Sequence, residues 1–415
     1  MDVNPPSFFP ATIGDAPFRH REGLPALVAA LGADMTRYVG GIVRDTLLGI
    51  DAADIDLATV HAPDDVIDRL AAARIRVVPT GIAHGTVTAV LPSGPIEVTT
   101  LRRDVATDGR HAIVAFTDDW REDAARRDFT MNALYADPVS GAVVDYFDGL
   151  ADLAAGRVRF IGDPYTRIAE DHLRILRFFR FHARFGDRID AAGLDACAAR
   201  ANDLMALSRE RIAAELLKLL VAANAVPVVV TMIDGGILRA VLPEIDRAGV
   251  GRLATLAERE AAAGIVPDPI RRLASLLPTE AVAADVGARL KLSKAKRQRL
   301  EQDAAPIQDQ AALELAYRQG IDIAVDRLLL STRPLADTVA EIAVLMRWTP
   351  PRFPLSGRDI IARGITSGPA VARLLKEVER HWIAAGFPDT PTTAGLADRI
   401  VGQVSAKGGG GAIIA

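Results

Sequence analysis

The stretch GGIVRDTLLG at residues 40–49, followed by DIDLAT at 54–59, decides the fold. A glycine pair before a helix offers free backbone N–H groups and the positive end of a helix dipole, which favour a phosphate. Asp54 and Asp56 stand two positions apart on an expected strand, so their side chains point to the same face. The stretch therefore predicts a phosphate site beside a carboxylate pair, the arrangement that nucleotidyl transfer with Mg²⁺ requires.

Each half of this stretch also has a simpler interpretation. Most Asp-x-Asp pairs are surface charges or turn residues, and a doublet such as Gly40-Gly41 is often only a tight turn. The order strand, glycines, helix, short loop, strand favours the functional interpretation. A third acid, Glu97, lies on another expected strand at 96–101. If the two strands are neighbours, the three acids converge on two metal ions; if not, Glu97 is a solvated residue on an open sheet face.

Length and composition restrict the class of protein. A chain of 415 residues is expected to form two or more domains. The formal charge of −4 does not indicate a nucleic-acid partner, so any such binding must come from local basic patches. The single cysteine, Cys197, fits a reducing cytosol and predicts a cytoplasmic protein. No apolar run approaches the ~18 residues of a membrane span, and the N-terminal residues lack the features of a signal peptide.

The pattern of hydrophobic residues predicts an α/β head, with a small mixed sheet and helices, followed by an all-helical remainder. Expected strands lie at 38–40, 55–58, 74–78, 85–91, 96–101 and 142–146, and from about residue 163 apolar residues recur at helical spacing. The predicted parts are a catalytic head at 1–150, a helical neck at 151–225, a helical body and tail at 226–405, and a disordered tail at 406–415.

A second motif, RRDFTMNAL at 126–134, combines groups that suit a nucleotide. The guanidinium of Arg127 matches phosphate oxygens, Asp128 can orient an arginine, and the amide of Asn132 can bind a sugar hydroxyl. A surface run of arginine and aspartate is the plainer alternative, and composition alone favours it.

A third motif, EDHLRILRFFRF at 170–181, places Glu170, Arg174 and Arg177 on one stripe of a helix, with Asp171 alongside. Intrahelical ion pairs worth a few tenths of a kcal/mol each are the alternative interpretation.

In this order and spacing, the motifs resemble those of class II tRNA nucleotidyltransferases (CCA-adding enzymes) and the related bacterial poly(A) polymerases. The resemblance covers about residues 36–225, including SRERI at 208–212 and ELLKLL at 215–220, which are similar to the family's neck helix. It implies a nucleotidyltransferase head in which Asp54 and Asp56 bind metal and Glu97 is the third carboxylate.

The same resemblance implies roles for the other candidate residues. Gly40, Gly41 and Arg44 belong to the nucleotide site, and Arg127, Asp128 and Asn132 hold the sugar and the triphosphate. Asp171 and Arg174 read the incoming base, while Glu170 and Arg177 hold them in place.

The chemistry of the bases supports a carboxylate–guanidinium reader. Cytosine and adenine both present an amino donor beside a ring-nitrogen acceptor, whereas uracil and guanine present the reverse order. A carboxylate acceptor next to a guanidinium donor therefore accepts C and A and rejects U and G. One unsatisfied buried group costs about 1–3 kcal/mol, so no nucleic-acid template is needed.

In the family, the change from C to A addition depends on a flexible loop between the third acid and the arginine motif. The corresponding segment here is 102–121, which contains DGRH at 108–111 and has full length. This length predicts competence for the terminal A. An ordinary polar loop is the alternative.

The RNA would be held by the helical part. Its strongest basic patch, at 289–299, contains Arg289, Lys291, Lys294, Lys296 and Arg297 and would bind backbone phosphates. As an isolated run, such a patch is more often a solvated helix face.

The sequence thus predicts an enzyme that adds C, C and A to the 3′ end of tRNA from CTP and ATP with release of pyrophosphate, using two Mg²⁺ ions. Its partners are tRNA and nucleoside triphosphates, with no membrane. The alternatives are a poly(A) polymerase, an enzyme that adds only the final A, and an inactive RNA-binding protein on the same scaffold.

Overall fold

The computed structural model describes residues 11–51, 54–107, 112–306 and 310–408. They form two compact units. The first is drawn from residues up to 254 and from 268–304, and the second from 255–267 and from 305 onward. The predicted boundaries between head, neck and body remain predictions.

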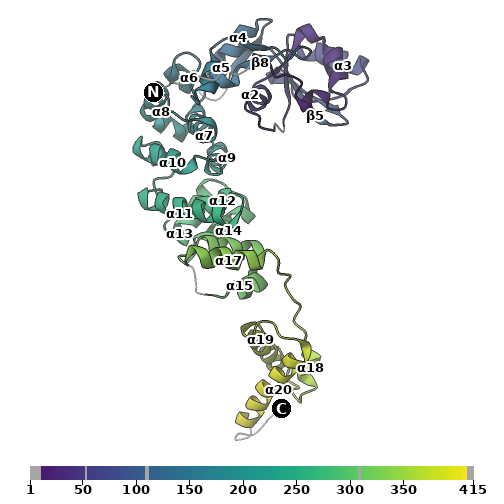
Figure 1. The fold of residues 1–415 in the computed structure, drawn as a ribbon, viewed down its shortest axis with the longest axis vertical. Coiled ribbons are helices and arrows are strands. Elements are labelled where there is room, and N and C mark those ends of the chain that lie inside the picture. The colour runs from purple at the N-terminus through teal and green to yellow at the C-terminus, as the bar shows by residue number, and fades with distance from the viewer. Residues whose placement is uncertain (1–10, 52–53, 108–111, 307–309, 409–415) are drawn as a thin grey trace, which may run out of the picture. The chain divides into compact units, whose positions relative to one another are not determined.

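The first unit begins with the part of the chain drawn in purple and blue in Figure 1. It contains a seven-stranded mixed sheet, in the strand order β3-β4-β5-β2-β1-β8-β9. Its strands are β1 (Thr36–Val39), β2 (Asp56–Thr59), β3 (Arg76–Gly81), β4 (Thr86–Leu91), β5 (Gly94–Thr100), β8 (Leu134–Ala136) and β9 (Val143–Asp145). β2 and β5 pair in parallel, and the other neighbouring strands of this sheet are antiparallel. The mixed sheet predicted for the head is confirmed; β8 was not predicted.

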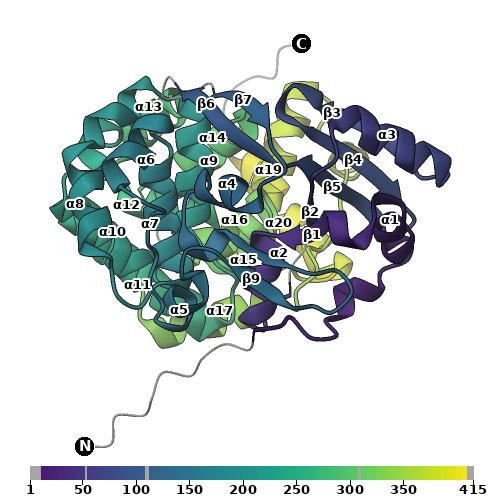
Figure 2. The same ribbon diagram turned by 90° about the horizontal axis from the view of Figure 1, so that it is seen from above.

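The helices of the head are α1 (Leu24–Leu31), α2 (Gly41–Leu47), α3 (Pro63–Ala72), α4 (Trp120–Ala125) and α5 (Gly149–Ala154). α1 and α3 lie beside the strands β3 to β5 (Figure 2). Val87, Ala89 and Val98 alternate along β4 and β5 and are buried. Because strand side chains alternate, Glu97 lies on the other face and is exposed.

The predicted loop at 102–121 instead contains a separate two-stranded sheet. Its strands are β6 (Arg102–Thr107) and β7 (Ala112–Phe116), and α4 follows directly. The DGRH segment at 108–111 lies outside the described residues.

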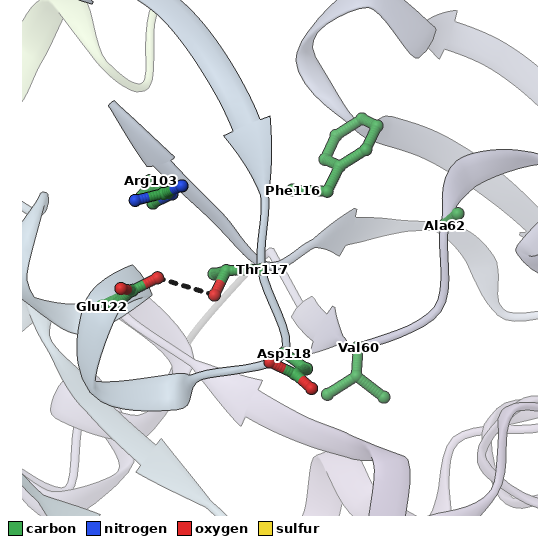
Figure 3. A pocket seen from close by; sticks show the side chains of 7 residues that line it. All are labelled: Val60, Ala62, Arg103, Phe116, Thr117, Asp118 and Glu122. Carbon is green, nitrogen blue, oxygen red and sulfur yellow. Dashed lines mark hydrogen bonds between the residues drawn. The ribbon is translucent and has the colours of Figure 1, made fainter. Parts of the chain in front are cut away.

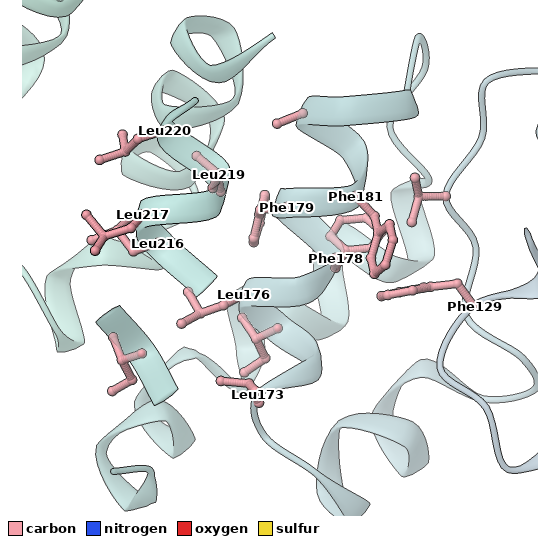
Figure 4. Close-up of a cluster of buried hydrophobic side chains, with 14 of the residues drawn as sticks. Phe129, Leu173, Leu176, Phe178, Phe179, Phe181, Leu216, Leu217, Leu219 and Leu220 are labelled. Carbon is pink, nitrogen blue, oxygen red and sulfur yellow. The ribbon is translucent and has the colours of Figure 1, made fainter. Parts of the chain in front are cut away.

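The rest of the first unit is helical, as predicted. Its helices are α6 (Pro164–Glu170), α7 (Arg174–Phe185), α8 (Ala191–Ala199), α9 (Arg209–Leu220), α10 (Ala225–Asp234), α11 (Arg247–Ala263, which continues into the second unit), α12 (Pro269–Leu276), α13 (Glu280–Arg289) and α14 (Lys294–Ala304). α7 and α9 pack on each other through apolar rows, in which Leu176, Phe179 and Leu216 are buried (Figure 4). This packing leaves the polar edges of both helices facing outward.

The second unit contains α15 (Ala312–Gln319), α16 (Ile321–Leu329), α17 (Leu335–Leu345), α18 (Gly357–Ile361), α19 (Gly368–Ala384) and α20 (Thr390–Gly408). Its apolar residues form one cluster around α15 to α17 and another around α18 to α20. No described residue of this unit belongs to a strand.

Candidate active site

The three acids predicted from the sequence lie on or beside β2 and β5, two neighbouring inner strands of the sheet. Asp56 is the first residue of β2, and Glu97 is its direct partner on the parallel strand β5. Residues paired in parallel register point to the same face. Asp54 precedes β2 by two residues and is exposed, like Glu97, while Asp56 is partly buried.

The pKa of Asp56 reflects its burial and the neighbouring acids. Burial, followed by the neighbouring carboxylates of Glu97 and Asp54, raises the pKa of Asp56 to about 6, although Arg127 acts in the opposite direction. A group of negative charges that raises the pKa of one member attracts a cation or a proton.

A polar cleft of about 700 Å³ opens beside the acids. Asp54 and Asp56 line it, and Glu97 lies outside its lining. Its other lining residues carry guanidinium groups or belong to the predicted motifs: Gly40, Gly41, Arg44, Arg102, Arg126, Arg127, Asp128, Asn132, Asp171, Leu173, Arg174, Arg177, Arg180, Phe181 and Arg211.

The glycine doublet permits a close approach at the start of α2. Gly40 has φ of +71° and precedes the helix, a conformation that favours glycine. A Cβ at this position would lie 3.5 Å from Arg127 Nη1 and 3.6 Å from the carbonyl oxygen of Asn132. The first and second motifs therefore meet at Gly40.

A chain of hydrogen bonds links α2 to the second motif. The Arg44 Nε donates to Asp45 at 2.7 Å, and its Nη1 donates to the side-chain oxygen of Asn132. The Asn132 amide donates to Asp128 at 2.9 Å. All four side chains are buried, so the polar groups of the site are fixed before any ligand binds.

Asp123, which sequence reasoning missed, holds two arginines of the cleft. It accepts hydrogen bonds from Arg126 at 2.7 Å, from Arg127 at 3.0 Å and from the Tyr135 hydroxyl at 2.6 Å. Burial alone would raise its pKa, but Arg127 and Arg126 hold the pKa of Asp123 below its usual range. Asp123 precedes Arg126 and Arg127 by three and four residues, a spacing that would have predicted ion pairs on one side of a helix.

The third motif is not one helical stripe, and that prediction was wrong. α6 ends at Glu170 and α7 begins at Arg174, because Asp171 is extended, with φ of −148°. The Asp171 carboxylate accepts the backbone N–H of Leu173 at 3.1 Å, which stabilises this break. The break turns Asp171 into the cleft beside Arg174.

The two predicted base readers are held by different partners. Glu170 accepts a hydrogen bond from Arg174, as predicted. The Arg174 guanidinium also donates to the carbonyl oxygens of Arg167 at 2.8 Å and of Arg126 at 3.0 Å. These bonds fix the plane of the Arg174 guanidinium at the cleft wall.

Arg177 has a partner that was not predicted. It donates to Asp128 at 2.7 Å, and its charge also acts on Asp171. Asp171 is held by Arg211 of α9, whose Nη2 lies 3.2 and 3.0 Å from its two carboxylate oxygens. Arg211 belongs to the neck motif at 208–212, but forty residues of sequence separate it from Asp171, so the pair could not be assigned from spacing.

The basic patch at 289–299 is only partly available to a ligand. Arg289 donates to Glu244 at 2.7 Å, and Lys291 lies 3.0 Å from Glu210. Lys294, Lys296 and Arg297 are exposed at the start of α14.

A second hollow of about 500 Å³ lies near β7, lined by Val60, Ala62, Arg103, Phe116, Thr117, Asp118 and Glu122 (Figure 3). Thr117 donates to Glu122 across it at 2.7 Å. It contains none of the predicted site residues.

Metal-binding clusters and membrane-spanning helices are both absent from the described part of the chain. No set of three or more His, Cys, Asp or Glu side chains there is gathered closely enough to hold a metal by itself. No helix there combines the length and apolarity that a membrane crossing needs.

Family models match two segments. Residues 36–159 match the model described as the poly A polymerase head domain, and residues 188–248 match the model described as the probable RNA and SrmB-binding site of polymerase A.

Solved structures share the fold over nearly the whole chain. A CCA-adding enzyme of Bacillus stearothermophilus, crystallised in complex with CTP, covers 94% of this chain and 99% of its own, with a TM-score of 0.71 and 24% identity. A Thermotoga maritima CCA-adding enzyme complexed with tRNA_CCA covers 92% and 95%, with a TM-score of 0.66 and 19% identity.

Curated relatives extend the likeness to sequence. The Levilactobacillus brevis CCA-adding enzyme is 43% identical over 185 residues, which are 44% of this chain and 45% of that protein. The mitochondrial CCA tRNA nucleotidyltransferase 1 of Mus musculus is 36% identical over 395 residues, which are 88% of this chain and 87% of that protein. At this identity and coverage, the chain belongs to the family of CCA tRNA nucleotidyltransferases.

Proposed function

We propose that this protein adds C, C and A to the 3′ end of tRNA, using CTP and ATP and releasing pyrophosphate. The observation that carries the proposal is one cleft lined by Asp54 and Asp56, by the nucleotide motif around Arg127, and by Asp171 and Arg174. Catalytic acids, phosphate-binding arginines and a carboxylate–guanidinium pair are the three components that untemplated nucleotidyl transfer needs.

The acids fit a divalent metal. Asp56 ionises with difficulty beside Glu97 and Asp54, and a bound dication removes that repulsion. Mg²⁺ is commonly held by one or two carboxylates together with substrate phosphates, so Asp54 and Asp56 suffice on the protein side. When bound, Mg²⁺ supplies charge neutralisation at the reacting phosphate.

The side chains of the cleft position the nucleotide. Arg127 and Arg44 face the triphosphate beside the α2 N-terminus, and Asn132 faces the sugar. The RNA 3′-hydroxyl attacks the α-phosphorus in line as the bond to pyrophosphate breaks. Because Asp123, Asp128 and Asp45 already fix the arginines and the amide, little reorganisation is needed during the reaction.

Asp171 and Arg174 recognise the base edge shared by cytosine and adenine. Arg211 binds Asp171 and Glu170 binds Arg174, so each reader is held by a partner of its own at the cleft. The exposed Lys294, Lys296 and Arg297 of α14 are the proposed phosphate contacts of the predicted basic patch.

The proposed compartment remains the cytosol, although the mouse relative is named a mitochondrial enzyme.

The test is incorporation of each labelled nucleotide onto tRNAs that end before C, after C and after CC. The expected result is C, C and then A, with addition stopping there. Sustained A addition to an oligo(A) primer would identify a poly(A) polymerase, whose head-domain model also matches 36–159. Failure to use CTP would identify an enzyme that adds only the final A. The double variant Asp54→Ala with Asp56→Ala should be inactive in every assay. If it were as active as wild type, the two acids would not be catalytic, and an inactive RNA-binding protein would become the better interpretation.

A further inference from the structure

A third hollow, which is cationic, adjoins the cleft along α7 and α9. It has a volume of about 430 Å³ and is lined by Arg180, Arg184, Lys218, Val221, Ala222 and Ala223. This volume lies within the range of about 300–1,000 Å³ that small-molecule sites occupy. Arg180 borders both the hollow and the cleft, so the two are continuous along α7.

Helix geometry explains this continuity. On α7, Arg177, Arg180 and Arg184 follow at i, i+3 and i+7, and therefore lie on one side of the helix. On α9, Arg211 and Lys218 are separated by seven residues and also share a side. Arg177 and Arg211 line the cleft at one end of these rows, while Arg184 and Lys218 line the hollow at the other.

The charge of the hollow is positive. Three of its six lining residues are cationic, and none is acidic. Arg180 donates to the buried Glu215, and Arg184 reaches Asp45 at 3.3 Å while staying 45% exposed. Lys218 is exposed, and among the described residues it has no ion-pair partner. The hollow therefore retains net positive charge at its rim.

The remaining lining residues of the hollow are apolar. Val221, Ala222 and Ala223 follow the end of α9 and present short side chains. A lining of cationic and small apolar residues suits a unit with a charged phosphate and a less polar sugar. A strand that ends at the catalytic acids consists of such units.

We infer that this hollow binds the phosphodiester backbone of the RNA acceptor strand, upstream of the reacting 3′-hydroxyl, with Lys218 and Arg184 as its phosphate contacts. The inference rests on the proposed function and adds a specific RNA subsite to it. Released pyrophosphate has the same chemistry as a ligand, so the experiment separates the two sources. Lys218 and Arg184 also lie near helix C-termini, where cations stabilise helices without any ligand.

The experiment compares wild type with Lys218→Ala, Lys218→Arg and Arg69→Ala in C addition to tRNA. Arg69 lies on α3 and is exposed, so its removal changes the net charge equally at a site outside the hollow. The readouts are KM for tRNA at several KCl concentrations, KM for CTP, the inhibition constant of pyrophosphate, and the melting temperature.

The expected result is that Lys218→Ala raises KM for tRNA several-fold and leaves KM for CTP unchanged. The slope of log KM against log [KCl] should fall by about 0.7–0.9, the change for one lost phosphate contact. Lys218→Arg should keep the wild-type slope, as should Arg69→Ala.

Three outcomes would overturn the inference. A lower melting temperature with an unchanged salt slope would leave Lys218 a helix-stabilising residue. A weaker inhibition by pyrophosphate with unchanged KM for tRNA would assign the hollow to the product. If Arg69→Ala changed the salt dependence of KM for tRNA as much as Lys218→Ala, the effect would come from the net charge of the protein and not from the hollow. By contrast, a wild-type protein that adds no C to tRNA contradicts the proposed function itself.

Discussion

Arg211 on α9 holds the carboxylate of Asp171 across forty residues of sequence, with its Nη2 at 3.2 and 3.0 Å from the two oxygens. The contact joins the neck helix to the break between α6 and α7. It takes up part of the hydrogen-bonding capacity of Asp171, which lines the cleft.

We expect Arg211→Lys to reduce the discrimination between CTP and UTP. A charged hydrogen bond contributes about 1.5–3 kcal/mol, so kcat/KM for CTP should fall by about 10- to 150-fold while that for UTP changes less. Single-nucleotide incorporation measures both. Arg209→Lys, on the same helix but outside the lining of the cleft, is the control, and an unchanged CTP/UTP ratio in Arg211→Lys would contradict the assignment.

Asp56→Asn should stabilise the metal-free protein at alkaline pH. The folded pKa of about 6 lies above the unfolded value of about 3.9. The folded state therefore binds more protons between about pH 4 and 6, so stability is lost as pH rises through that window. Removing the charge should gain about 1–2 kcal/mol at pH 8, allowing for the partial exposure of Asp56, and almost nothing at pH 4.

Urea denaturation in the presence of a chelator measures this gain. Asp68→Asn, which is exposed and lies beyond the first turn of α3, is the control and should be neutral at both pH values. If Asp56→Asn were less stable than wild type at pH 8 in the presence of a chelator, the Asp56 carboxylate of the wild type would have a favourable partner in the protein.

Arg177→Met should destabilise the fold, because it leaves the buried carboxylate of Asp128 without its main cation. Breaking a buried pair typically costs 3–5 kcal/mol, and the partial exposure of Arg177 reduces this to about 2–3 kcal/mol. The double variant with Asp128→Asn should recover part of the loss. If the effects of the two changes simply add in urea denaturation, the ion pair does not couple α7 to the second motif.

Gly149→Ala should lower stability by about 2 kcal/mol, the typical cost of overpacking. Its Cβ would overlap the backbone carbonyl of Thr130, which cannot move as a flexible side chain does. Gly251→Ala on α11 has open space around its Cβ and should be neutral or slightly stabilising. Equal melting temperatures for both variants would contradict this distinction.

The thiol of Cys197 should resist modification in the native protein. Its side chain is fully buried, and burial raises the pKa of the Cys197 thiol well above its usual range. A thiol reagent should react at once in urea and only slowly without it. Rapid reaction of the native protein would indicate local opening around α8.

The sequence predicted those parts of the site that depend on local spacing. Asp54 and Asp56 are near neighbours in the chain, and the strands that carry Asp56 and Glu97 could be recognised from their alternation. Their pairing is confirmed by the register of β2 and β5. The glycine doublet was recognisable for the same reason, because its strand and helix flank it directly.

Contacts between distant segments could not be predicted in this way. Arg211 and Asp123 act through partners on other elements, and Arg177 was assigned to its own helix although its partner is Asp128. The helical stripe at 170–181 failed because the local hydrogen bond of Asp171 to Leu173 outweighs helix propensity there. β6 and β7 were missed because neither sequence alternates between apolar and polar residues: β6 (RRDVAT) is mainly polar and β7 (AIVAF) is entirely apolar.

The parallel register of β2 and β5 also restricts where insertions and deletions can be tolerated in this sequence. A residue inserted into or deleted from either strand would bring Ile96 or Val98, not Glu97, level with Asp56, and the side chain there would face the core. Insertions and deletions should therefore accumulate in the turn at 92–93 and never within the two strands. A deletion scan across 86–100 would show this as a sharp boundary between tolerated and inactivating positions.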